Sequence, residues 1–520
     1  MIGVVTRDAP AGAMRAPAAP LGPTAMIIRL IAAGAGGALT GTAVLTGWWA
    51  VAVIGTGVVA SAVHDIRPAR RAMVGTAAGC VHATVTTLWA SQFNASAAAA
   101  LILIQAAGWG LAALAVSMRA RWPWPLAPAL AISEWARTHW PLGGYPLAQL
   151  WLTQADGPLA ALAPLLGPFA ITAAIVLLAT AGIAALQRRP AAIRVLAASL
   201  ITVGAAQLAP IPSPVAPMEV AAVQGGDRRG VPAMRNDPGP LLERQIDLTR
   251  SLDTDVDLVV WPESALAVHG AMTTGDRRLL QELADGFDGV LIAGVVERFD
   301  LPDGAGWFRN AAVASDETGT LDRYDKQLPV PFGERVPARR FVELVVDLSL
   351  VPRDMVAGSG PPILRTEHAD VGIAISYENL FPRVARQAVL QGADILAVPT
   401  LASSYVTDEI PTQQLAAARM RARETGRDLA IVGSTGPTAL IRADGTLAAQ
   451  APTDTPHVAQ ARLQTRSGTT LYTRYGDALP LAAAALVLSM TARRPAPRPL
   501  HAGLPAEPEH LAARRQERRP

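Results

Sequence analysis

Long uncharged apolar runs fill the first two hundred residues of this chain, and they constrain its fold more than any other feature. A run of about 20 apolar residues is long enough to cross a membrane as a helix. Such runs lie near residues 26–44, 47–64, 72–90, 97–118, 124–140, 158–186, 192–210 and 472–491. A mean hydropathy of +0.27 and a charged fraction of 17% agree with them, because soluble domains are on average more highly charged. The sequence therefore predicts a membrane domain with about eight transmembrane helices.

Arginine-rich links alternate with uncharged links between these runs. "RPARR", "RARW" and "QRRPAAIR" follow the second, fourth and sixth runs, whereas the uncharged "LTG" and "SQFNAS" follow the first and third. Short loops that carry positive charge stay on the cytoplasmic side of a membrane. We therefore expect a cytoplasmic N-terminus, and seven crossings then place the following soluble portion on the outer face.

These patterns divide the chain into five parts. We expect a cytoplasmic segment (1–25), a membrane domain with seven spans (26–212), an extracytoplasmic domain (213–466), a last span (467–492) and a basic cytoplasmic tail (493–520). The tail is rich in proline, alanine and arginine, so we expect it to be disordered. The arginines lack the interleaved aromatic residues of a nucleic-acid surface, so no nucleic-acid partner is expected despite the formal charge of +3.

Few residues in the apolar runs carry chemistry. Cys80 is the only cysteine and lies in "VGTAAGCVHATV", which excludes an intramolecular disulfide, and the eight histidines show no zinc-site spacing. Neither a metal nor a cofactor is therefore expected. Glu134 and Arg137 ("SEWARTHW") lie where the fifth run meets a long outer loop, and both a substrate contact and a satisfied interfacial pair remain open.

From Met218 onward, short β-like runs alternate with helical stretches. The β-like runs include "EVAAVQ", "DLVVWPES", "GVLIAGVVE", "NAAVASD", "DVGIAIS", "ADILAVPT" and "DLAIVGST", and the helical stretches include 240–252, "DRRLLQELAD", "PRVARQAVLQ" and 411–425. This alternation predicts an α/β domain. Reactive residues on such domains collect at the carboxyl ends of strands.

Three residues at predicted strand ends attract attention. Lys326 follows "TLDRY" and is the only lysine of the chain. It is either a stray lysine of an arginine-rich composition or a cation kept for its compact charge. Glu263 ends "DLVVWPE", where partial burial would raise its pKa toward the range of a general base, although acids also favour helix starts. Ser376 ends "DVGIAIS" and directly precedes "YENLFP", at a predicted strand-to-helix elbow, which suits a nucleophile but also an ordinary helix cap.

Several longer motifs occur around these residues in a fixed order. They are "VVWPES", "YDKQLPVPFGERVP", "GIAISYENLFP", "QQLAAARMRARETGRDLAIVGSTGPTALIRADG" and "GTTLYTRYGD". With Glu263, Lys326 and Ser376 they resemble the Glu-Lys-Cys triad of the nitrilase (carbon–nitrogen hydrolase) superfamily. More closely, residues 25–492 resemble the apolipoprotein N-acyltransferase family. This resemblance implies a nitrilase-like α-β-β-α sandwich between the seventh and eighth spans, in a bacterial plasma membrane.

The resemblance also implies an activity and a set of roles. It assigns the general base (Glu263), the cation that stabilises the oxyanion (Lys326), the nucleophile position (Ser376) and three supporting positions (Glu334, Tyr377 and Glu378). Members of the family take an acyl chain from a phospholipid, form an acyl-enzyme, and pass the chain to the N-terminal diacylglyceryl cysteine of a lipoprotein. The implied partners are therefore a phospholipid donor and a diacylated lipoprotein acceptor.

The chain departs from the family pattern at the nucleophile and in two loops. Ser376 stands where the family has cysteine, and a serine depends wholly on a neighbouring base for activation. "PTLASSY" replaces a Ser-Asn-Asp-x-Trp-Phe-like segment, and "VQGGDRRGVPAMRND" lacks an expected tryptophan. Impaired acyl transfer is therefore expected. The alternatives are a catalytically inactive relative that binds lipoproteins or assists an active enzyme, and a membrane-tethered amidase.

Overall fold

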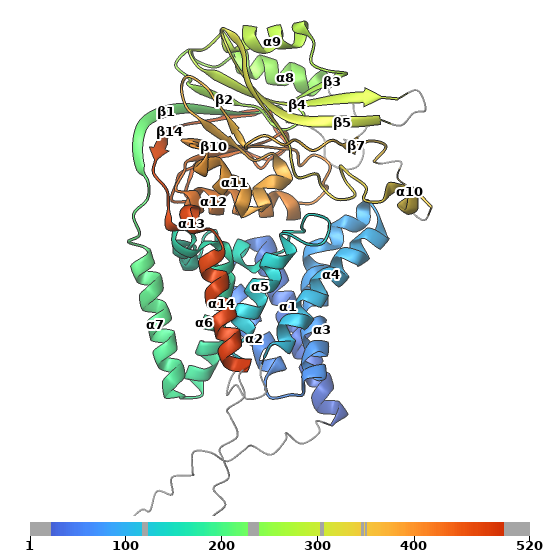
Figure 1. Ribbon diagram of the computed structural model, residues 1–520, viewed down its shortest axis with the longest axis vertical. Coiled ribbons are helices and arrows are strands. Elements are labelled where there is room, and N and C mark those ends of the chain that lie inside the picture. The colour runs from blue at the N-terminus through green and yellow to red at the C-terminus, as the bar shows by residue number, and fades with distance from the viewer. Residues whose placement is uncertain are drawn as a thin grey trace, which may run out of the picture.

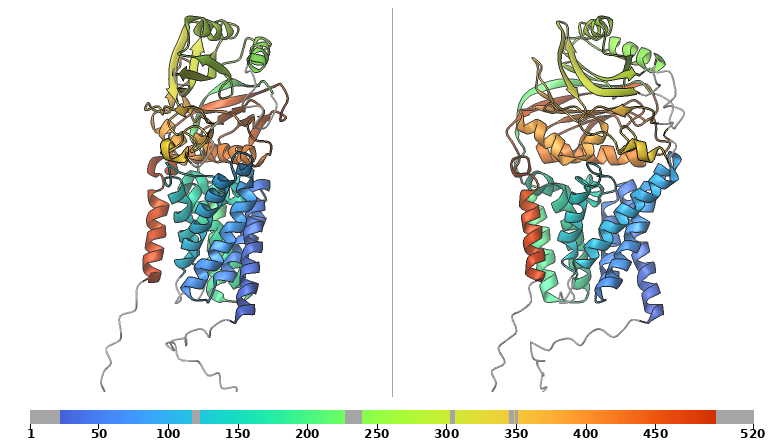
Figure 2. Two further views of the ribbon diagram at one scale, coloured as in Figure 1. Left: turned by 90° about the vertical axis from the view of Figure 1, so that its right-hand side faces the viewer. Right: turned by 45° about the vertical axis from the view of Figure 1, so that its right-hand side comes forward.

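The computed structural model describes residues 22–116, 123–226, 239–301, 306–344, 348 and 351–492. The expected tail (493–520), most of the N-terminal segment and the link "RARW" lie outside these described residues, as does most of "VQGGDRRGVPAMRND". The described chain forms a helical bundle with a layered α/β domain stacked on one end of it (Figures 1 and 2).

A helix lies in each of the eight predicted windows. These helices are α1 (Pro23–Thr46), α2 (Trp49–Val63), α3 (Pro68–Thr87), α4 (Ala95–Leu114), α5 (Leu126–Arg137), α6 (Ala163–Leu186), α7 (Pro190–Ala206) and α14 (Ala478–Ala492). Short 3₁₀ helices, η1 (Leu88–Gln92), η2 (Leu150–Gln154) and η3 (Pro158–Leu162), lie between them. Within the described chain, α1, α4 and the η3–α6 segment are long and apolar enough to cross a membrane, and α2, α7 and α14 are shorter apolar helices. Eight crossings therefore remain a prediction.

Small residues allow the first helices to pack closely. A methyl group added at Gly36 of α1 would lie 2.8 Å from the carbonyl oxygen of Gly55 in α2, and one at Gly79 of α3 would lie 2.8 Å from Ala106 of α4. Helices in lipid gain little from the hydrophobic effect and associate through such close van der Waals packing. The Ala/Gly-rich helices therefore pack into a tight bundle.

The α/β domain contains two sheets. The first sheet has the order β14-β1-β2-β4-β5-β6, with β3 beside β4 and β7 beside β5, and the second has the order β13-β12-β11-β10-β9-β8. The strands of the first sheet are β1 (Ser213–Gln224), β2 (Leu258–Val260), β3 (Leu266–His269), β4 (Val290–Asp300), β5 (Gly306–Asp316), β6 (Gly319–Asp325), β7 (Asp354–Met355) and β14 (His457–Ser467). Those of the second are β8 (Ile363–Leu364), β9 (Val371–Ile373), β10 (Ile395–Thr400), β11 (Leu429–Gly433), β12 (Ala439–Ile441) and β13 (Leu447–Gln450). The helices of the domain are α8 (Gly239–Arg250), α9 (Thr274–Ala284), α10 (Arg339–Val342), η5 (Ser376–Leu380), α11 (Pro382–Leu390), α12 (Glu409–Thr425) and α13 (Leu471–Tyr475).

Alternation along β1 explains the layering. Val220 and Ala222 enter the core between the two sheets, whereas Ala221 and Val223 enter the core beneath α8 and α9. Helices α11 and α12 cover the outer face of the second sheet and rest on the helical bundle (Figure 1). The predicted α-β-β-α sandwich is therefore confirmed.

A single apolar core joins the sandwich to the bundle. Leu396 and Ile431 of the second sheet belong to the same buried cluster as Ala417 of α12, Trp151 of η2 and Ile175 of α6. Since burial of apolar surface is the main stabilising contribution in folding, this continuous core fixes the sandwich against the bundle. The same packing holds the loops that follow the strands of the sandwich.

Candidate active site

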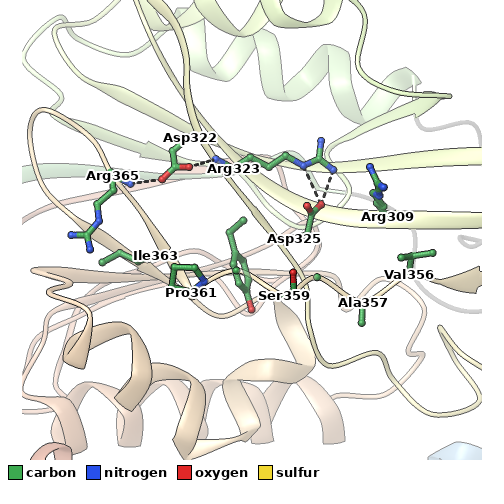
Figure 3. Close-up of a pocket in the computed structure, with 13 residues that line it drawn as sticks. Arg309, Asp322, Arg323, Asp325, Val356, Ala357, Ser359, Pro361, Ile363 and Arg365 are labelled. Carbon is green, nitrogen blue, oxygen red and sulfur yellow. Dashed lines mark hydrogen bonds and ion pairs between the residues drawn. The ribbon is translucent and has the colours of Figure 1, made fainter.

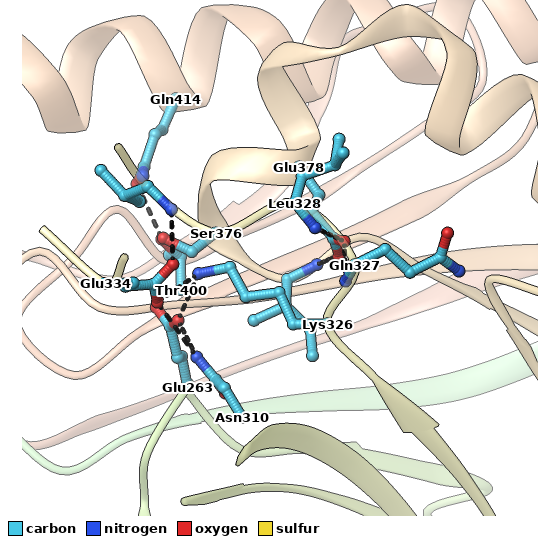
Figure 4. A network of polar contacts seen from close by, with 12 residues as sticks. Glu263, Asn310, Lys326, Gln327, Leu328, Glu334, Ser376, Glu378, Thr400 and Gln414 are labelled. Atoms are coloured by element: carbon cyan, nitrogen blue, oxygen red, sulfur yellow. Dashed lines mark hydrogen bonds and ion pairs between the residues drawn. The ribbon is translucent and has the colours of Figure 1, made fainter. Parts of the chain in front are cut away.

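Lys326 lies at the centre of a buried polar cluster. Its Nζ donates to Oε1 of Glu263 at 3.0 Å and to Oε1 of Glu334 at 2.7 Å. Nδ2 of Asn310 donates to the same Glu263 oxygen at 2.6 Å and lies 3.4 Å from the Glu334 oxygen (Figure 4). The only lysine of the sequence is 1% exposed, so its charge is compensated within the protein.

The strands that bring these residues together are shorter than the sequence suggested. Strand β2 ends at Val260 and β9 at Ile373, so Glu263 and Ser376 each lie three residues beyond their strand rather than at its last position. Pro262 cannot donate a backbone hydrogen bond, which explains why pairing stops before Glu263. Lys326 directly follows β6, as predicted, and its backbone N donates to the Asn310 carbonyl at 2.8 Å.

Ser376 occupies a strained elbow. Its φ is +52°, in the left-handed region that non-glycine residues rarely adopt, and it starts the 3₁₀ helix η5. Such strain persists where the surrounding structure enforces it and is common at functional positions. Among the described residues, no hydrogen bond joins Ser376 Oγ to Glu263 or Lys326; its neighbour is Thr400, with the two hydroxyl oxygens 3.3 Å apart.

Glu378 connects the serine elbow to the lysine. Its Oε1 accepts hydrogen bonds from Tyr324 Oη at 2.9 Å and from the backbone N of Gln327 and Leu328 at 2.8 and 3.2 Å. Its Oε2 accepts from the backbone N of Ile375 at 2.9 Å. One buried carboxylate therefore binds the residue after Lys326 and the residue before Ser376.

Burial and neighbouring charges perturb this cluster. Burial raises the pKa of Glu263, and the nearby Glu334 carboxylate adds to this, although the Lys326 ammonium opposes both. Burial alone would lower the pKa of Lys326, but its attraction to Glu263 and Glu334 outweighs this and raises the pKa. Burial also raises the pKa of Glu378. Lys326 therefore stays protonated, while Glu263 is a stronger base than an exposed glutamate.

The loop that follows α5 holds the Ser376 elbow against the helical bundle. Tyr377 Oη donates to the Gly144 carbonyl at 2.8 Å, and Arg383 Nη1 donates to the Thr138 carbonyl at 2.6 Å. Glu134 and Arg137, the two charged residues of the fifth apolar run, also hold this loop. Glu134 accepts from the backbone N of Leu150 at 2.6 Å, and Arg137 donates to the Leu147 carbonyl at 3.1 Å. These contacts favour the structural interpretation of Glu134 and Arg137 over a substrate contact.

Four polar residues of the site were not predicted from the sequence. Two of them contact the predicted residues directly: Asn310 bridges the carboxylates and Tyr324 binds Glu378. The other two, Thr400 and Gln414, extend from Ser376. Asn310 and Thr400 lie in apolar strand runs, where a buried polar residue is a usable signal; Gln414 has no such signal in its helix.

The departing segment "PTLASSY" carries Tyr405 to the bundle. The Tyr405 ring packs edge-on against Trp89 at 5.2 Å and Phe93 at 5.9 Å, both at the junction of α3 and α4. Edge-to-face aromatic pairs of this kind stabilise contacts beyond their buried area. The segment thus keeps an aromatic contact with the membrane domain although its sequence differs from the family pattern.

A separate polar pocket of about 400 Å³ lies beside β6 (Figure 3). Both aspartates of its lining accept hydrogen bonds from within the lining: Arg323 Nη2 donates to Asp325, and the backbone N of Arg365 donates to Asp322. Its described lining contains none of the predicted site residues. In the part of the chain that the structure describes, no group of three or more His, Cys, Asp or Glu side chains could hold a metal ion.

Two family models match the two halves of this architecture. The carbon-nitrogen hydrolase model matches residues 219–471, which form the sandwich, and the model of the apolipoprotein N-acyltransferase N-terminal domain matches residues 35–181 of the bundle. The fold and these matches define a class, that of membrane proteins with a carbon–nitrogen hydrolase domain on a helical bundle.

Relatives narrow the class to one family. An apolipoprotein N-acyltransferase of Pseudomonas aeruginosa is 31% identical, over 71% of this chain and 74% of that protein. Those of Photobacterium profundum (29%, over 66% and 68%) and Mycolicibacterium smegmatis (28%, over 52% and 46%) are also similar. The chain belongs to the apolipoprotein N-acyltransferase family and is an acyltransferase of a bacterial membrane.

Solved structures are similar to about half of the chain. Saccharomyces cerevisiae Nit3, of the nitrilase superfamily, is 18% identical with a TM-score of 0.35, over 49% of this chain and 92% of that chain. An amidase from Nesterenkonia sp. is 18% identical with a TM-score of 0.34, over 48% and 90%.

Proposed function

We propose that this protein transfers an acyl chain from a phospholipid to the N-terminal diacylglyceryl cysteine of lipoproteins, through an acyl-enzyme on Ser376. The observation that carries this proposal is the buried contact of Lys326 with Glu263 and Glu334, tied through Glu378 to the serine elbow. A base, a fixed cation and a hydroxyl at a strained turn are the components of nucleophilic acyl transfer.

Each proposed step conserves protons. Ser376 Oγ attacks the ester carbonyl carbon of the phospholipid and its proton passes to Glu263. The ammonium of Lys326 stabilises the resulting oxyanion, and the glycerol oxygen leaves with the proton from Glu263. The α-amino group of the lipoprotein then attacks the acyl-serine ester, Glu263 accepts one amine proton, and Ser376 regains a proton as the amide forms.

The other predicted residues act in this scheme through the groups that they position. Glu334 holds Lys326, and Glu378 fixes the loops that carry Lys326 and Ser376. Tyr377 anchors the elbow to the bundle. We assign Glu334, Tyr377 and Glu378 to support, and Glu263, Lys326 and Ser376 to chemistry.

The serine is expected to slow both half-reactions. A cysteine is a few per cent thiolate at about neutral pH, whereas a serine hydroxyl is activated only by its base. An ester is also less reactive toward an amine than a thioester is. We therefore propose an enzyme with impaired turnover relative to one with the family's cysteine.

We further propose the predicted topology. The eight helices cross the membrane, residues 26–212 carry seven spans and 467–492 the last, and the domain of residues 213–466 faces the extracytoplasmic side. The parity of the helices and the arginine-rich links support this orientation. It gives the active site access to lipids and lipoproteins of the outer leaflet, with 1–25 and the tail (493–520) in the cytoplasm.

Mass spectrometry of the purified protein after incubation with phospholipid tests the proposal. We expect an acyl adduct on Ser376, faster adduct formation in Ser376→Cys, and an N-acylated product when a diacylated lipopeptide is added. No adduct on either protein would refute the mechanism and favour a catalytically inactive accessory protein. Ammonia release from small amides without acyl transfer would favour the amidase.

A further inference from the structure

Three polar side chains, those of Ser376, Thr400 and Gln414, form a continuous series of contacts. Thr400 Oγ1 lies 3.3 Å from Ser376 Oγ and 2.8 Å from Gln414 Oε1 (Figure 4). Thr400 is fully buried and Gln414 is 3% exposed, and Asn379 Nδ2 donates to the Gln414 carbonyl at 2.8 Å. The three groups therefore form a fixed network.

The hydrogen bonds of this network can run in one of two directions. The Thr400 hydroxyl carries one proton, so it can donate to Gln414 or to Ser376 but not to both. Oxygen-to-oxygen hydrogen bonds are strongest near about 2.8 Å, so Thr400 donates to Gln414 in this arrangement. The Thr400 oxygen is then an acceptor for the Ser376 hydroxyl, and a Ser376 proton donated to it is turned away from Glu263.

The reverse direction suits catalysis. If Thr400 donates to Ser376, the serine proton is free to point at Glu263. Oε1 of Glu263 already accepts from Asn310 and Lys326, whereas no hydrogen bond from the described residues to its Oε2 is present, so Oε2 is the oxygen to which we assign the serine proton. The Thr400 proton therefore decides whether the nucleophile faces its base.

We infer that Thr400 and Gln414 are positioning residues that set the direction of the Ser376 hydroxyl: Gln414 holds the resting direction by drawing the Thr400 proton, and Thr400 gives the reactive direction when it donates to Ser376. This inference rests on the proposed acyl-enzyme at Ser376. A thiolate transfers no proton when it attacks, and sulfur is a weak hydrogen-bond acceptor, so the same network matters little to a cysteine.

The rate of acyl-enzyme formation with phospholipid vesicles, measured by intact-protein mass spectrometry in the full chain, tests the inference. Thr400→Val keeps the shape and removes the hydroxyl, and we expect acylation about tenfold slower, with Thr400→Ser restoring the rate. Gln414→Met removes the competing acceptor, and we expect acylation about threefold faster. Gln413→Met is the matched control, because Gln413 binds the backbone N of Ala148 and not Thr400.

Measuring Thr400→Val in the Ser376→Cys variant as well separates the orienting role of the Thr400 hydroxyl from its contribution to packing. We expect Thr400→Val to slow Ser376→Cys by less than about twofold. Equal slowing in both backgrounds, or slowing by Gln414→Met as large as that by Thr400→Val, would overturn the inference while leaving the acyl-enzyme intact. Absence of an adduct on both Ser376 and Ser376→Cys would overturn the proposed function itself. An adduct on Ser376→Cys alone would also overturn the inference, because the network would then leave the serine inert.

Discussion

Replacing Lys326 with methionine should separate the stability of the site from its chemistry. The substitution keeps the length of the side chain but leaves Glu263 and Glu334 facing each other without a cation. Both Oε1 atoms lie within 3.0 Å of the same Nζ, so their mutual repulsion is about 3 kcal/mol at a separation of roughly 5 Å and an effective dielectric constant of about 20. Loss of one partner of a buried ion pair typically costs about 3–5 kcal/mol, so we expect a decrease of that size in the free energy of unfolding.

Activity should fall for a different reason. Removing one donor to a developing oxyanion typically lowers kcat by about 10²–10³-fold, so acyl-enzyme formation should nearly vanish in Lys326→Met. The double variant Lys326→Met/Glu334→Gln removes the repulsion between the two carboxylates but does not restore the ammonium donor. We therefore expect it to regain most of the stability and none of the activity.

Thermal unfolding in detergent and the acylation rate test this reasoning on the same preparations. Glu282→Gln is a suitable control, because its i,i+4 pair with Arg278 is exposed and such pairs contribute little. Lys326→Met with wild-type acylation would refute the catalytic role. A double variant no more stable than Lys326→Met would refute the electrostatic account of the cluster.

Three further perturbations have directions fixed by the structure. Tyr377→Phe removes the hydrogen bond to Gly144 and should lower the free energy of unfolding by about 1 kcal/mol, seen as a lower melting temperature in detergent; an unchanged temperature contradicts the anchoring role. Glu334→Gln removes a charge that raises the pKa of Glu263, so the acidic limb of the acylation rate should move to lower pH, and an upward or absent movement contradicts this. Burial raises the pKa of Glu424 to about 8, so the folded protein holds this proton more tightly than the unfolded chain does. Wild type should therefore lose stability relative to Glu424→Gln as the pH rises toward 8. The difference is at most roughly 5 kcal/mol, and chemical denaturation at a series of pH values measures it; a constant difference contradicts the assignment.

Lys326 and Glu263 were singled out from the sequence because their chemistry is unusual where they stand, whereas Glu334 and Glu378 came from the family resemblance. A single lysine in a chain of arginines and a glutamate after an apolar strand stand out without any neighbour. The structure places Lys326 against Glu263 and Glu334, which are 63 and 8 residues away. Hydroxyl and amide groups are common and uncharged, so nothing in the order of residues announces that Thr400 and Gln414 meet Ser376.

The α/β class was predictable from the alternation of β-like and helical stretches, and the α-β-β-α sandwich from the family resemblance, but the strand ends were not. The continuous apolar run Val220–Val223 of β1 is buried on both faces of its sheet, as the two cores show. Where a strand stops depends on tertiary contacts. Strand β9 ends at Ile373 because the chain must turn into the left-handed conformation of Ser376, which four hydrogen bonds to Glu378 help to enforce.

A serine at the nucleophile position moves the chemical requirement from acidity to orientation. A thiol supplies a reactive fraction by ionising, and this needs only a suitable electrostatic environment. A hydroxyl stays protonated, so its reactivity depends on where its single proton points. The groups that matter most to such an enzyme are therefore the neutral neighbours that set this direction, as well as the ions around Lys326. Thr400 belongs to the segment that departs from the family pattern, so the changed nucleophile and the changed loop meet at one hydrogen bond. A substitution at Thr400 that an enzyme with cysteine would tolerate should therefore change the acylation rate of this serine enzyme.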